Sequence, residues 1–263
     1  MRVSISSLKA FKACPRMYWL KYHEGLEPVK QKSDALITGS NYHSLLETLY
    51  HDGSLIDVEE DNSKELAMAC AYWKYIYPNF KVRSVEDWFE YSVTRTIKLV
   101  GRTDGIAEDG SLVEHKTVSG DIGEEYLYNL QWDEQILAYM LAKNTRKIYY
   151  TVIQKPTIKQ KKTESDEEFF RRMIDWYDEE TERKIRVFEI TRTDEEVERF
   201  RKELLATCME ARRMERREER CYKNTAHCFK WGRQCDYAPV CLNYDPNLEY
   251  VQFVRKERNH DGN

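Results

Sequence analysis

The sequence has no apolar run that approaches the length of a membrane span, and its first residues lack the apolar core of a secretory signal. These absences exclude a membrane-spanning protein and predict a cytoplasmic one with no membrane partner. Disulfides are rare in that compartment. We therefore expect the seven cysteines to be core thiols or metal ligands.

The chain also lacks a strong excess of basic residues, an internal repeat and an obvious linker. Its net charge of -4 argues against a protein that coats DNA with an overall basic surface. It does not exclude a nucleic-acid enzyme, because the charge of the binding channel decides that. Hydrophobic residues make up 41% of the 263 residues, which is enough for one substantial core. We therefore expect a single domain over residues 1–263.

Apolar periodicity and capping patterns outline an α/β fold. Helices are predicted at residues 4–13, 40–50, 64–77, 126–142, 165–176 and from 193 onward, and strands at 88–95, 96–106, 111–117, 147–154 and 184–190. Two capping-box patterns open helices, Ser165 with Glu168 and Thr193 with Glu196. This order of elements predicts a central mixed β-sheet flanked by helices.

An acidic hairpin is the most informative local feature of the sequence. Residues 108–110 form a predicted three-residue turn in which Gly110 takes the left-handed conformation. In that register Asp104 lies opposite Glu114, and strand alternation places Lys116 on the same face as Glu114. Two carboxylates and an ammonium group then converge on a patch that could hold a divalent cation against a phosphodiester. The alternative interpretation is a solvated ion pair on a surface hairpin.

The cysteines form a second constellation. Three of them lie in one loop-rich segment: Cys228, Cys235 and Cys241. A tetrahedral thiolate site needs four ligands. Cys14, beside Pro15 at a helix break, is the preferred fourth ligand, with Cys221 as its competitor. The long gaps between the late cysteines favour a [4Fe–4S] cluster over zinc, so that residues 221–245 would be joined to the N-terminal helix through Cys14.

Six motifs, taken together and in order, resemble the RecB-like branch of the PD-(D/E)xK nuclease family. They are the N-terminal segment Ser4–Tyr18, Gly39-Ser-Asn-Tyr-His43, Gly101-Arg-Thr-Asp104, Glu114-His-Lys116, Gln135-Ile-Leu-Ala-Tyr139 and the three late cysteines. The cysteines resemble the iron–sulfur subset of that family, which includes CRISPR-adaptation nucleases and the nuclease domains of helicase–nuclease machines. The resemblance covers nearly the whole chain, and no helicase motor accompanies it. It therefore indicates a stand-alone PD-(D/E)xK nuclease.

The resemblance implies a Mg²⁺- or Mn²⁺-dependent deoxyribonuclease. The implied metal ligands are His43, Asp104, Glu114 and the backbone carbonyl of His115. Lys116 is the implied catalytic lysine, and Gln135 and Tyr139 share a helix face with Gln131 and could support the site. The implied cluster ligands are Cys14, Cys228, Cys235 and Cys241.

The expected activity is exonucleolytic, on single-stranded DNA or on frayed duplex ends. Recombination, repair and CRISPR adaptation are the expected settings, with protein partners from those pathways. Cleavage polarity, endonucleolytic cleavage and oligomeric state are not fixed by the motifs. Two other functions compete with this one, a catalytically silent DNA-binding accessory protein with a structural iron–sulfur cluster and a redox-sensing iron–sulfur protein.

Two charged features receive a structural interpretation. Glu90, on the strand before the hairpin, could approach the metal but is better explained as a solvated residue. A group of arginines alternates with acids and is interpreted as an ion-paired, solvated helix face. This group is Arg212, Arg213, Arg216 and Arg217, with Glu215, Glu218 and Glu219 between and after them.

Overall fold

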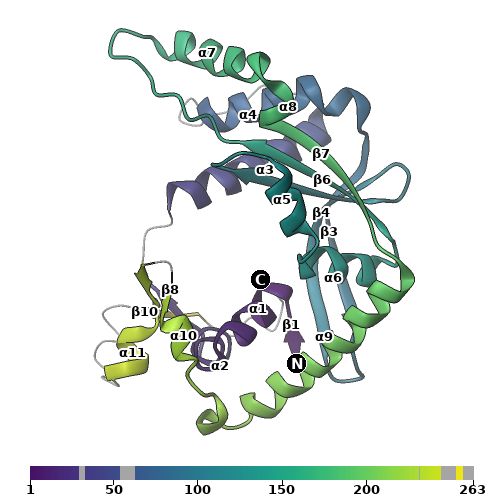
Figure 1. Ribbon diagram of the computed structural model, residues 1–263, viewed down its shortest axis with the longest axis vertical. Coiled ribbons are helices and arrows are strands. Elements are labelled where there is room, and N and C mark those ends of the chain that lie inside the picture. Colours follow the sequence, from purple (N-terminus) through teal and green to yellow (C-terminus); the bar gives the residue numbers. More distant parts are fainter. Residues whose placement is uncertain (30–32, 54–62, 231, 244–252, 257–263) are drawn as a thin grey trace. The chain divides into compact units, whose positions relative to one another are not determined.

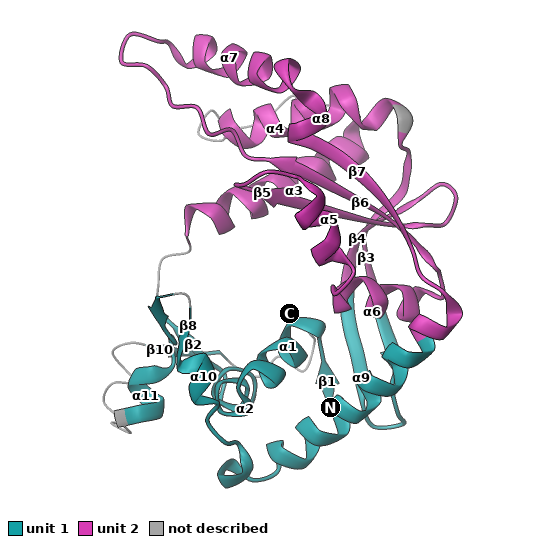
Figure 2. Ribbon diagram, viewed as in Figure 1, with its two compact units in different colours: residues 1–31, 89–101, 198–263 teal, residues 32–88, 102–197 magenta. Residues whose placement is uncertain are grey.

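The structure is a computed structural model that describes residues 1–29, 33–53, 63–230, 232–243 and 253–256. The chain divides into two compact units, which Figure 2 shows in different colours. Unit 1 comprises Met1–Gln31, Phe89–Gly101 and Glu198–Asn263, and unit 2 comprises Lys32–Trp88 and Arg102–Val197. The single domain expected over residues 1–263 stays a prediction. Residues 244–245 of the predicted cysteine segment lie outside the described residues.

The central sheet is mixed, as predicted. Its strands are β1 (Arg2–Val3), β3 (Val82–Ser92), β4 (Lys98–Ala107), β5 (Leu112–Val118), β6 (Lys147–Gln154) and β7 (Ile185–Thr191). Their order is β1-β4-β5-β6-β7, and β3 also pairs with β4. The pair β5–β6 is parallel, whereas β4–β5 and β6–β7 are antiparallel. A parallel pair needs a crossover connection, which here contains two helices.

Helices cover both faces of the sheet in unit 2 (Figure 1). One face carries α3 (Asp34–Asp52), α4 (Ser63–Tyr75) and α7 (Asp166–Glu179), and the other carries α5 (Glu124–Leu130) and α6 (Glu134–Lys143). On the first face the buried rings of Tyr42 and Tyr72 belong to the same core as Val113 of β5. On the second face the ring of Phe188 stacks on Tyr126 of α5, with ring centroids 6.4 Å apart. A short helix, α8 (Thr181–Lys184), leads into β7.

Unit 1 brings together segments from both ends of the chain. Its elements include α1 (Ile5–Ala13), α2 (Pro15–Tyr18), a π-helical turn (Trp19–His23), β2 (Leu26–Pro28), α10 (Thr225–Cys228), β8 (Phe229–Lys230), β9 (Arg233–Gln234), α11 (Ala238–Asn243) and β10 (Phe253–Arg255). Phe11 and Tyr18 share a buried core with Tyr237. Strand β10 pairs antiparallel with β2, although most of the chain separates them in sequence. The long helix α9 (Asp194–Glu215) begins in unit 2 and continues in unit 1.

The two capping-box predictions are confirmed. The hydroxyl of Ser165 accepts a hydrogen bond from the backbone N–H of Glu168 at 3.2 Å, and the Glu168 carboxylate accepts from the N–H of Ser165 at 3.0 Å. Thr193 and Glu196 make the same reciprocal pair at the start of α9. Such boxes satisfy two N–H groups that a helix start otherwise leaves without partners.

The single helix predicted at residues 126–142 is wrong. The segment forms α5 and α6, because the carboxylate of Asp133 accepts a hydrogen bond from the N–H of Gln135 at 3.0 Å and begins a new helix. Gln131 therefore does not share a helix face with Gln135 and Tyr139. In the part of the chain that the structure describes, no helix is long and apolar enough to cross a bilayer.

Candidate active site

The hairpin between β4 and β5 has the predicted register. Gly110 has a φ of +83°, the left-handed conformation that the turn requires. Gly105 pairs with Val113 and Ile106 pairs with Leu112. The same register places Asp104 opposite Glu114, so the two acids stand side by side on neighbouring strands.

The two strands separate at the acids. Beyond the pair of Gly105 and Val113, the backbone N–H of His115 donates to the Oδ2 atom of Asp104 at 2.7 Å. A side-chain carboxylate therefore takes a hydrogen bond that a backbone carbonyl would accept in a regular ladder.

His43 of α3 lies against Asp104. Its Nδ1 atom is 3.5 Å from the Oδ1 atom of Asp104. Burial opposes ionisation of Asp104, but the hydrogen bond and the positive charge of His43 outweigh it and lower the pKa of Asp104 to about 2. Burial likewise lowers the pKa of His43, and the hydrogen bond to Asp104 more than reverses this, so its pKa is raised. Each partner therefore stabilises the charged form of the other, the carboxylate of Asp104 and the imidazolium of His43.

Glu114 is the most deeply buried acid of the site, at 2% exposure. Its Oε1 atom accepts hydrogen bonds from the ammonium group of Lys116 and, at 2.8 Å, from the Nε2 atom of Gln135 on α6. The Nε2 atom of Gln135 is also 2.8 Å from the hydroxyl of Tyr139. Burial and the charge of Asp104 raise the pKa of Glu114 to about 7, although Lys116 opposes this. Burial lowers the pKa of Lys116, but the charges of Glu114 and Asp104 prevail and raise it.

The side chain of His115 faces the other side of the sheet. It is 2% exposed, and its Nδ1 atom is 2.6 Å from the hydroxyl of Thr151. Its Nε2 atom is 3.4 Å from the hydroxyl of Tyr50. Burial lowers the pKa of His115 to about 3, so the ring is neutral. The imidazole therefore packs on the opposite face of the sheet from Glu114. The backbone N–H of His115, and not its ring, donates to Asp104.

The side chains that could hold a divalent cation pair with one another in this structure, except at one oxygen of Glu114. Among the described residues, no three His, Cys, Asp or Glu side chains are already gathered as a metal site. Instead, His43 pairs with Asp104, and Lys116 pairs with Glu114. The Oε2 atom of Glu114 is buried and has no hydrogen-bond partner in the described structure. A buried carboxylate oxygen without a partner costs free energy, and carboxylate oxygens with one imidazole are ligands that Mg²⁺ and Mn²⁺ accept.

Sequence reasoning missed Glu86 of β3. This residue has a φ of +53°, which is rare outside glycine, and its carboxylate pairs with Arg102. Burial raises the pKa of Glu86, and the nearby charge of Asp104 raises it further. Glu86 thus lies close enough to Asp104 for the two carboxyl groups to influence each other. Glu90, four residues further along β3, instead pairs with Arg2 at 3.3 Å and Lys98 at 3.4 Å, as expected of a solvated residue.

The four cysteines proposed as cluster ligands line one cavity in unit 1. These are Cys14, Cys228, Cys235 and Cys241. Burial raises the pKa of Cys235, and the charges of Cys14 and Cys228 add to the effect. The backbone N–H of Asn224 donates to the Sγ atom of Cys14 at 3.4 Å. The four cysteines therefore line a common cavity, and Cys14 and Cys228 are close enough to Cys235 to influence its thiol electrostatically.

Cys221 is placed differently from these four. It is 5% exposed, it does not line the cavity, and its thiol donates to the backbone carbonyl of Met214 at 3.6 Å. Burial raises the pKa of the Cys221 thiol to about 11. Its environment is that of a core thiol.

The family model of the PD-(D/E)XK nuclease superfamily matches residues 2–242 of the chain. No curated protein sequence matches it. Among solved structures, a candidate exonuclease from Eubacterium rectale is similar with a TM-score of 0.53 and 12% identity, over 81% of this chain and 80% of that one. At this level of identity, the similarity shows a shared fold and nothing more.

Two further structures are similar at a lower level. The alkaline exonuclease LHK-Exo from Laribacter hongkongensis has a TM-score of 0.39 and 12% identity, over 82% of this chain and 90% of that one. A phage-related exonuclease from Haemophilus somnus has a TM-score of 0.35 and 16% identity, over 73% and 90% of the two chains. Likenesses at this level support no conclusion about this chain.

Proposed function

The chain belongs to the PD-(D/E)xK nuclease superfamily, and on that premise we propose that it is a metal-dependent deoxyribonuclease that degrades DNA from single-stranded or frayed ends. The observation that carries this proposal is the buried Oε2 atom of Glu114, which has no partner in the described structure and lies beside Asp104 and Lys116. A protein that only bound DNA would gain nothing from a buried carboxylate without a partner near the phosphate. A catalytically silent accessory role is therefore the weaker alternative.

Each residue of the site has a role in this proposal. The residues that would hold Mg²⁺ or Mn²⁺ are His43, Asp104, Glu114 and the backbone carbonyl of His115. When bound, such an ion polarises the scissile phosphate and makes a water more acidic. Lys116, whose ammonium group already contacts Glu114, would orient the attacking water and offset the charge that develops on the phosphoryl oxygens. Gln135 holds the Glu114 carboxylate in place, and Tyr139 contacts Gln135.

Two exposed aromatic rings next to the site support a single-stranded substrate. Tyr128 is 57% exposed and Trp132 is 71% exposed, and their ring centroids are 6.4 Å apart. Trp132 is three residues before Gln135, so it lies within about 10 Å of chain from a residue that contacts Glu114. Unpaired bases stack on such rings, whereas the bases of an intact duplex do not expose their faces.

The proposed activity can be tested with end-labelled DNA. The protein, purified anaerobically, is incubated with linear and circular single strands and with linear duplexes in Mn²⁺ or Mg²⁺, and with excess chelator as control. We expect cleavage of linear single strands, slower cleavage of duplexes, and no cleavage of circles or of any substrate with chelator. Metal-dependent cleavage of circular DNA would identify an endonuclease. DNA binding without cleavage in either metal would favour the accessory role.

We expect Trp132→Ala to raise the KM for a linear single strand about 5-fold or more, because stacking on one base contributes about 1–3 kcal/mol. The KM for a blunt duplex should change much less. Steady-state kinetics on both substrates measures this difference. Trp88→Ala is the matched control, because Trp88 is also half exposed but its ring contacts Arg102. Equal effects of Trp132→Ala on the two substrates would refute the stacking role.

We expect Gln135→Met to lower kcat by about 10- to 100-fold, the usual cost of removing a partner that orients a ligand. The variant keeps a similar volume but no longer donates to Oε1 of Glu114. Gln131→Met is the control, since Gln131 is exposed on the neighbouring helix end. Single-turnover cleavage at saturating Mn²⁺ measures the effect, and a Gln135→Met rate within 3-fold of the Gln131→Met rate would contradict it.

We also propose that the four cavity cysteines hold a [4Fe–4S] cluster. Four thiolates are the ligand set of such a cluster, and the four cysteines line one cavity. The cluster would connect α1 and α2 to the C-terminal cysteine segment within unit 1 and would be structural rather than catalytic.

A further inference from the structure

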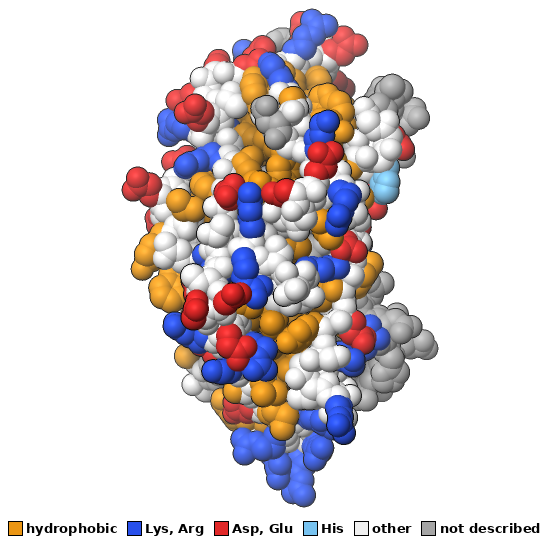
Figure 3. Space-filling model, turned by 90° about the vertical axis from the view of Figure 1, so that its right-hand side faces the viewer, with side chains coloured by type: hydrophobic (Ala, Val, Ile, Leu, Met, Phe, Trp, Pro, Cys, Tyr) orange, Lys and Arg blue, Asp and Glu red, His pale blue; other side chains and the backbone are white. Residues whose placement is uncertain are grey.

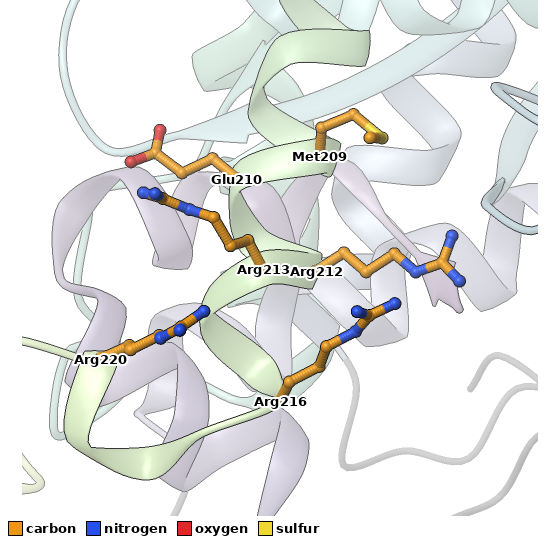
Figure 4. A pocket seen from close by; sticks show the side chains of 6 residues that line it. All are labelled: Met209, Glu210, Arg212, Arg213, Arg216 and Arg220. Carbon is orange, nitrogen blue, oxygen red and sulfur yellow. The ribbon is translucent and has the colours of Figure 1, made fainter.

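Four arginines line one hollow on the surface of unit 1. The hollow has a volume of about 570 Å³ and lies at the C-terminal end of α9 and the segment after it. Its lining residues are Met209, Glu210, Arg212, Arg213, Arg216 and Arg220 (Figure 4). Figure 3 shows Lys and Arg side chains gathered toward the lower end of the face along which α9 runs. We call this set of residues the arginine hollow.

The arginine hollow is not neutralised in the way that the sequence pattern suggests. The interleaved acids are engaged elsewhere, because Glu218 pairs with Arg16 at 2.6 Å and Glu219 lies 4.0 Å from Arg217. Among the described residues, none of the four arginines of the hollow forms an ion pair with a carboxylate. Glu210 is the one acid among the described residues that line the hollow. The interpretation of these arginines as an ion-paired helix face is therefore wrong for the hollow.

The arrangement suits a polyanion. Arg212 and Arg216 are four residues apart, so they lie one helical turn apart on one side, and Figure 4 shows their guanidinium groups projecting in the same direction. Arg212 is fixed by a hydrogen bond to the hydroxyl of Thr96, which leaves its other N–H groups available. Like charges at this spacing repel each other, and an anion between them removes that repulsion.

Stabilisation of the C-terminal end of α9 does not explain all four arginines of the hollow. Basic side chains in a last turn interact favourably with the helix dipole, and this accounts for Arg212 and Arg213. Arg216 and Arg220, however, follow the last residue of α9, Glu215. Their side chains have no hydrogen bond or ion pair among the described residues, so the fold itself does not require them.

We propose that the arginine hollow binds the phosphodiester backbone of the DNA substrate, an inference that rests on the proposed nuclease function. Guanidinium groups form bidentate hydrogen bonds to phosphate, and phosphate contacts are independent of base sequence. A protein partner is less suited, because the cores of protein interfaces are depleted of charged residues, whereas four of the six described residues that line the hollow are arginines. Interfaces with DNA are polar and strongly positive.

The test compares two double variants with equal charge loss. Arg216→Gln/Arg220→Gln removes two arginines of the hollow that make no side-chain contact in the described structure. Arg171→Gln/Arg183→Gln removes two exposed arginines of unit 2 that pair with acids on their own helices or next to them. The Kd for a fluorescent oligo-dT is measured with chelator, so that no cleavage occurs, between 50 and 200 mM salt, where the Debye length falls from about 14 Å to about 7 Å. Cleavage in Mn²⁺ and thermal melting are measured on the same samples.

If the proposal holds, the first variant binds at least tenfold more weakly at 50 mM salt, and the slope of log Kd against log salt falls by about 1.4, the value for two lost contacts to a single strand. The control variant keeps the wild-type slope. Arg216→Lys/Arg220→Lys should recover the slope but only part of the affinity, because lysine keeps the positive charge but cannot form the bidentate hydrogen bonds of a guanidinium group. Unchanged melting shows that the fold is intact.

Two results would overturn the proposal. One is a wild-type slope in the first variant while the wild-type protein cleaves DNA, which removes the inference and leaves the nuclease function standing. The other is weaker binding of a poly-glutamate peptide without any change for DNA, which identifies a protein-docking surface. If the wild-type protein neither binds nor cleaves DNA, the proposed nuclease function itself is refuted. This result differs from the first one, in which the wild-type protein still cleaves DNA.

Discussion

Lys116→Ala is expected to lower the rate of DNA cleavage by about 10³-fold, the upper range for removal of one donor that stabilises a transition state. The ammonium group of Lys116 is the cation nearest to Glu114 and contacts its Oε1 atom. Without it, the charge that develops on the phosphate oxygens would be offset only by the metal ion of the proposed site. Single-turnover cleavage of a labelled single strand in Mn²⁺ measures the loss, and DNA binding in chelator should be nearly unchanged.

Loss of activity in this variant must be separated from loss of folding. Removal of Lys116 leaves Glu114 buried beside Asp104, and a buried acid without its cation can cost several kcal/mol. Burial and the charge of Asp104 already raise the pKa of Glu114 to about 7. Glu114 would therefore take up a proton in the variant at neutral pH, which limits the damage to stability.

Glu114→Gln provides the sharper control. The amide is isosteric and neutral, so it avoids the cost of ionising a group that is 2% exposed. We expect its melting temperature to equal or exceed that of the wild type while cleavage is lost, the usual signature of a site that sacrifices stability for function. Lys147→Ala, on the neighbouring part of the same sheet, should keep full activity. A cleavage rate of Lys116→Ala within 3-fold of the wild-type rate would refute the proposed catalytic role of Lys116.

The sequence alone predicts those features of the site that depend on residues close together in the chain. The register of the hairpin depends on one turn, and Gly110 together with the alternation of β5 determined that Asp104 and Glu114 would lie opposite each other. The capping boxes are equally local, because donor and acceptor are three residues apart. These are the features for which short-range physics and the final fold agree.

Features that depend on distant segments could not be derived in this way. The contact of His43 with Asp104 depends on how α3 packs, and the family resemblance, not periodicity, indicated it. Apolar spacing across residues 126–142 gave no sign of the break that Asp133 introduces. Glu86 and Glu90 have the same parity on β3, so only the fold shows which of them approaches the site. The pairing of β10 with β2 has no local sequence signal at all.

Cys235→Ser is expected to remove the iron–sulfur cluster and to destabilise unit 1. Anaerobically purified wild-type protein should contain about four irons per chain and absorb broadly in the visible blue. The variant should be colourless. In the chain-entropy model, closing a loop of more than one hundred residues stabilises the fold by about 5 kcal/mol, and Cys14 and Cys235 close nearly the whole chain. A loss of that size lowers the melting temperature by about 10–20 °C for a protein of this length.

Cys221→Ser separates the cluster from ordinary packing of thiols. Cys221 does not line the cavity of the other four cysteines, and its thiol contacts the carbonyl of Met214, which a serine hydroxyl can also reach. We therefore expect wild-type iron content and colour in this variant, with iron measured by mass spectrometry. Iron loss in Cys221→Ser together with retention in Cys228→Ser would assign the fourth ligand to Cys221. Zinc in place of iron, lost in Cys235→Ser, would keep the thiolate site but refute the cluster. Because the cavity lies in unit 1 and the acids lie in unit 2, residual cleavage by Cys235→Ser at low temperature would show that the cluster supports the fold and takes no part in the chemistry.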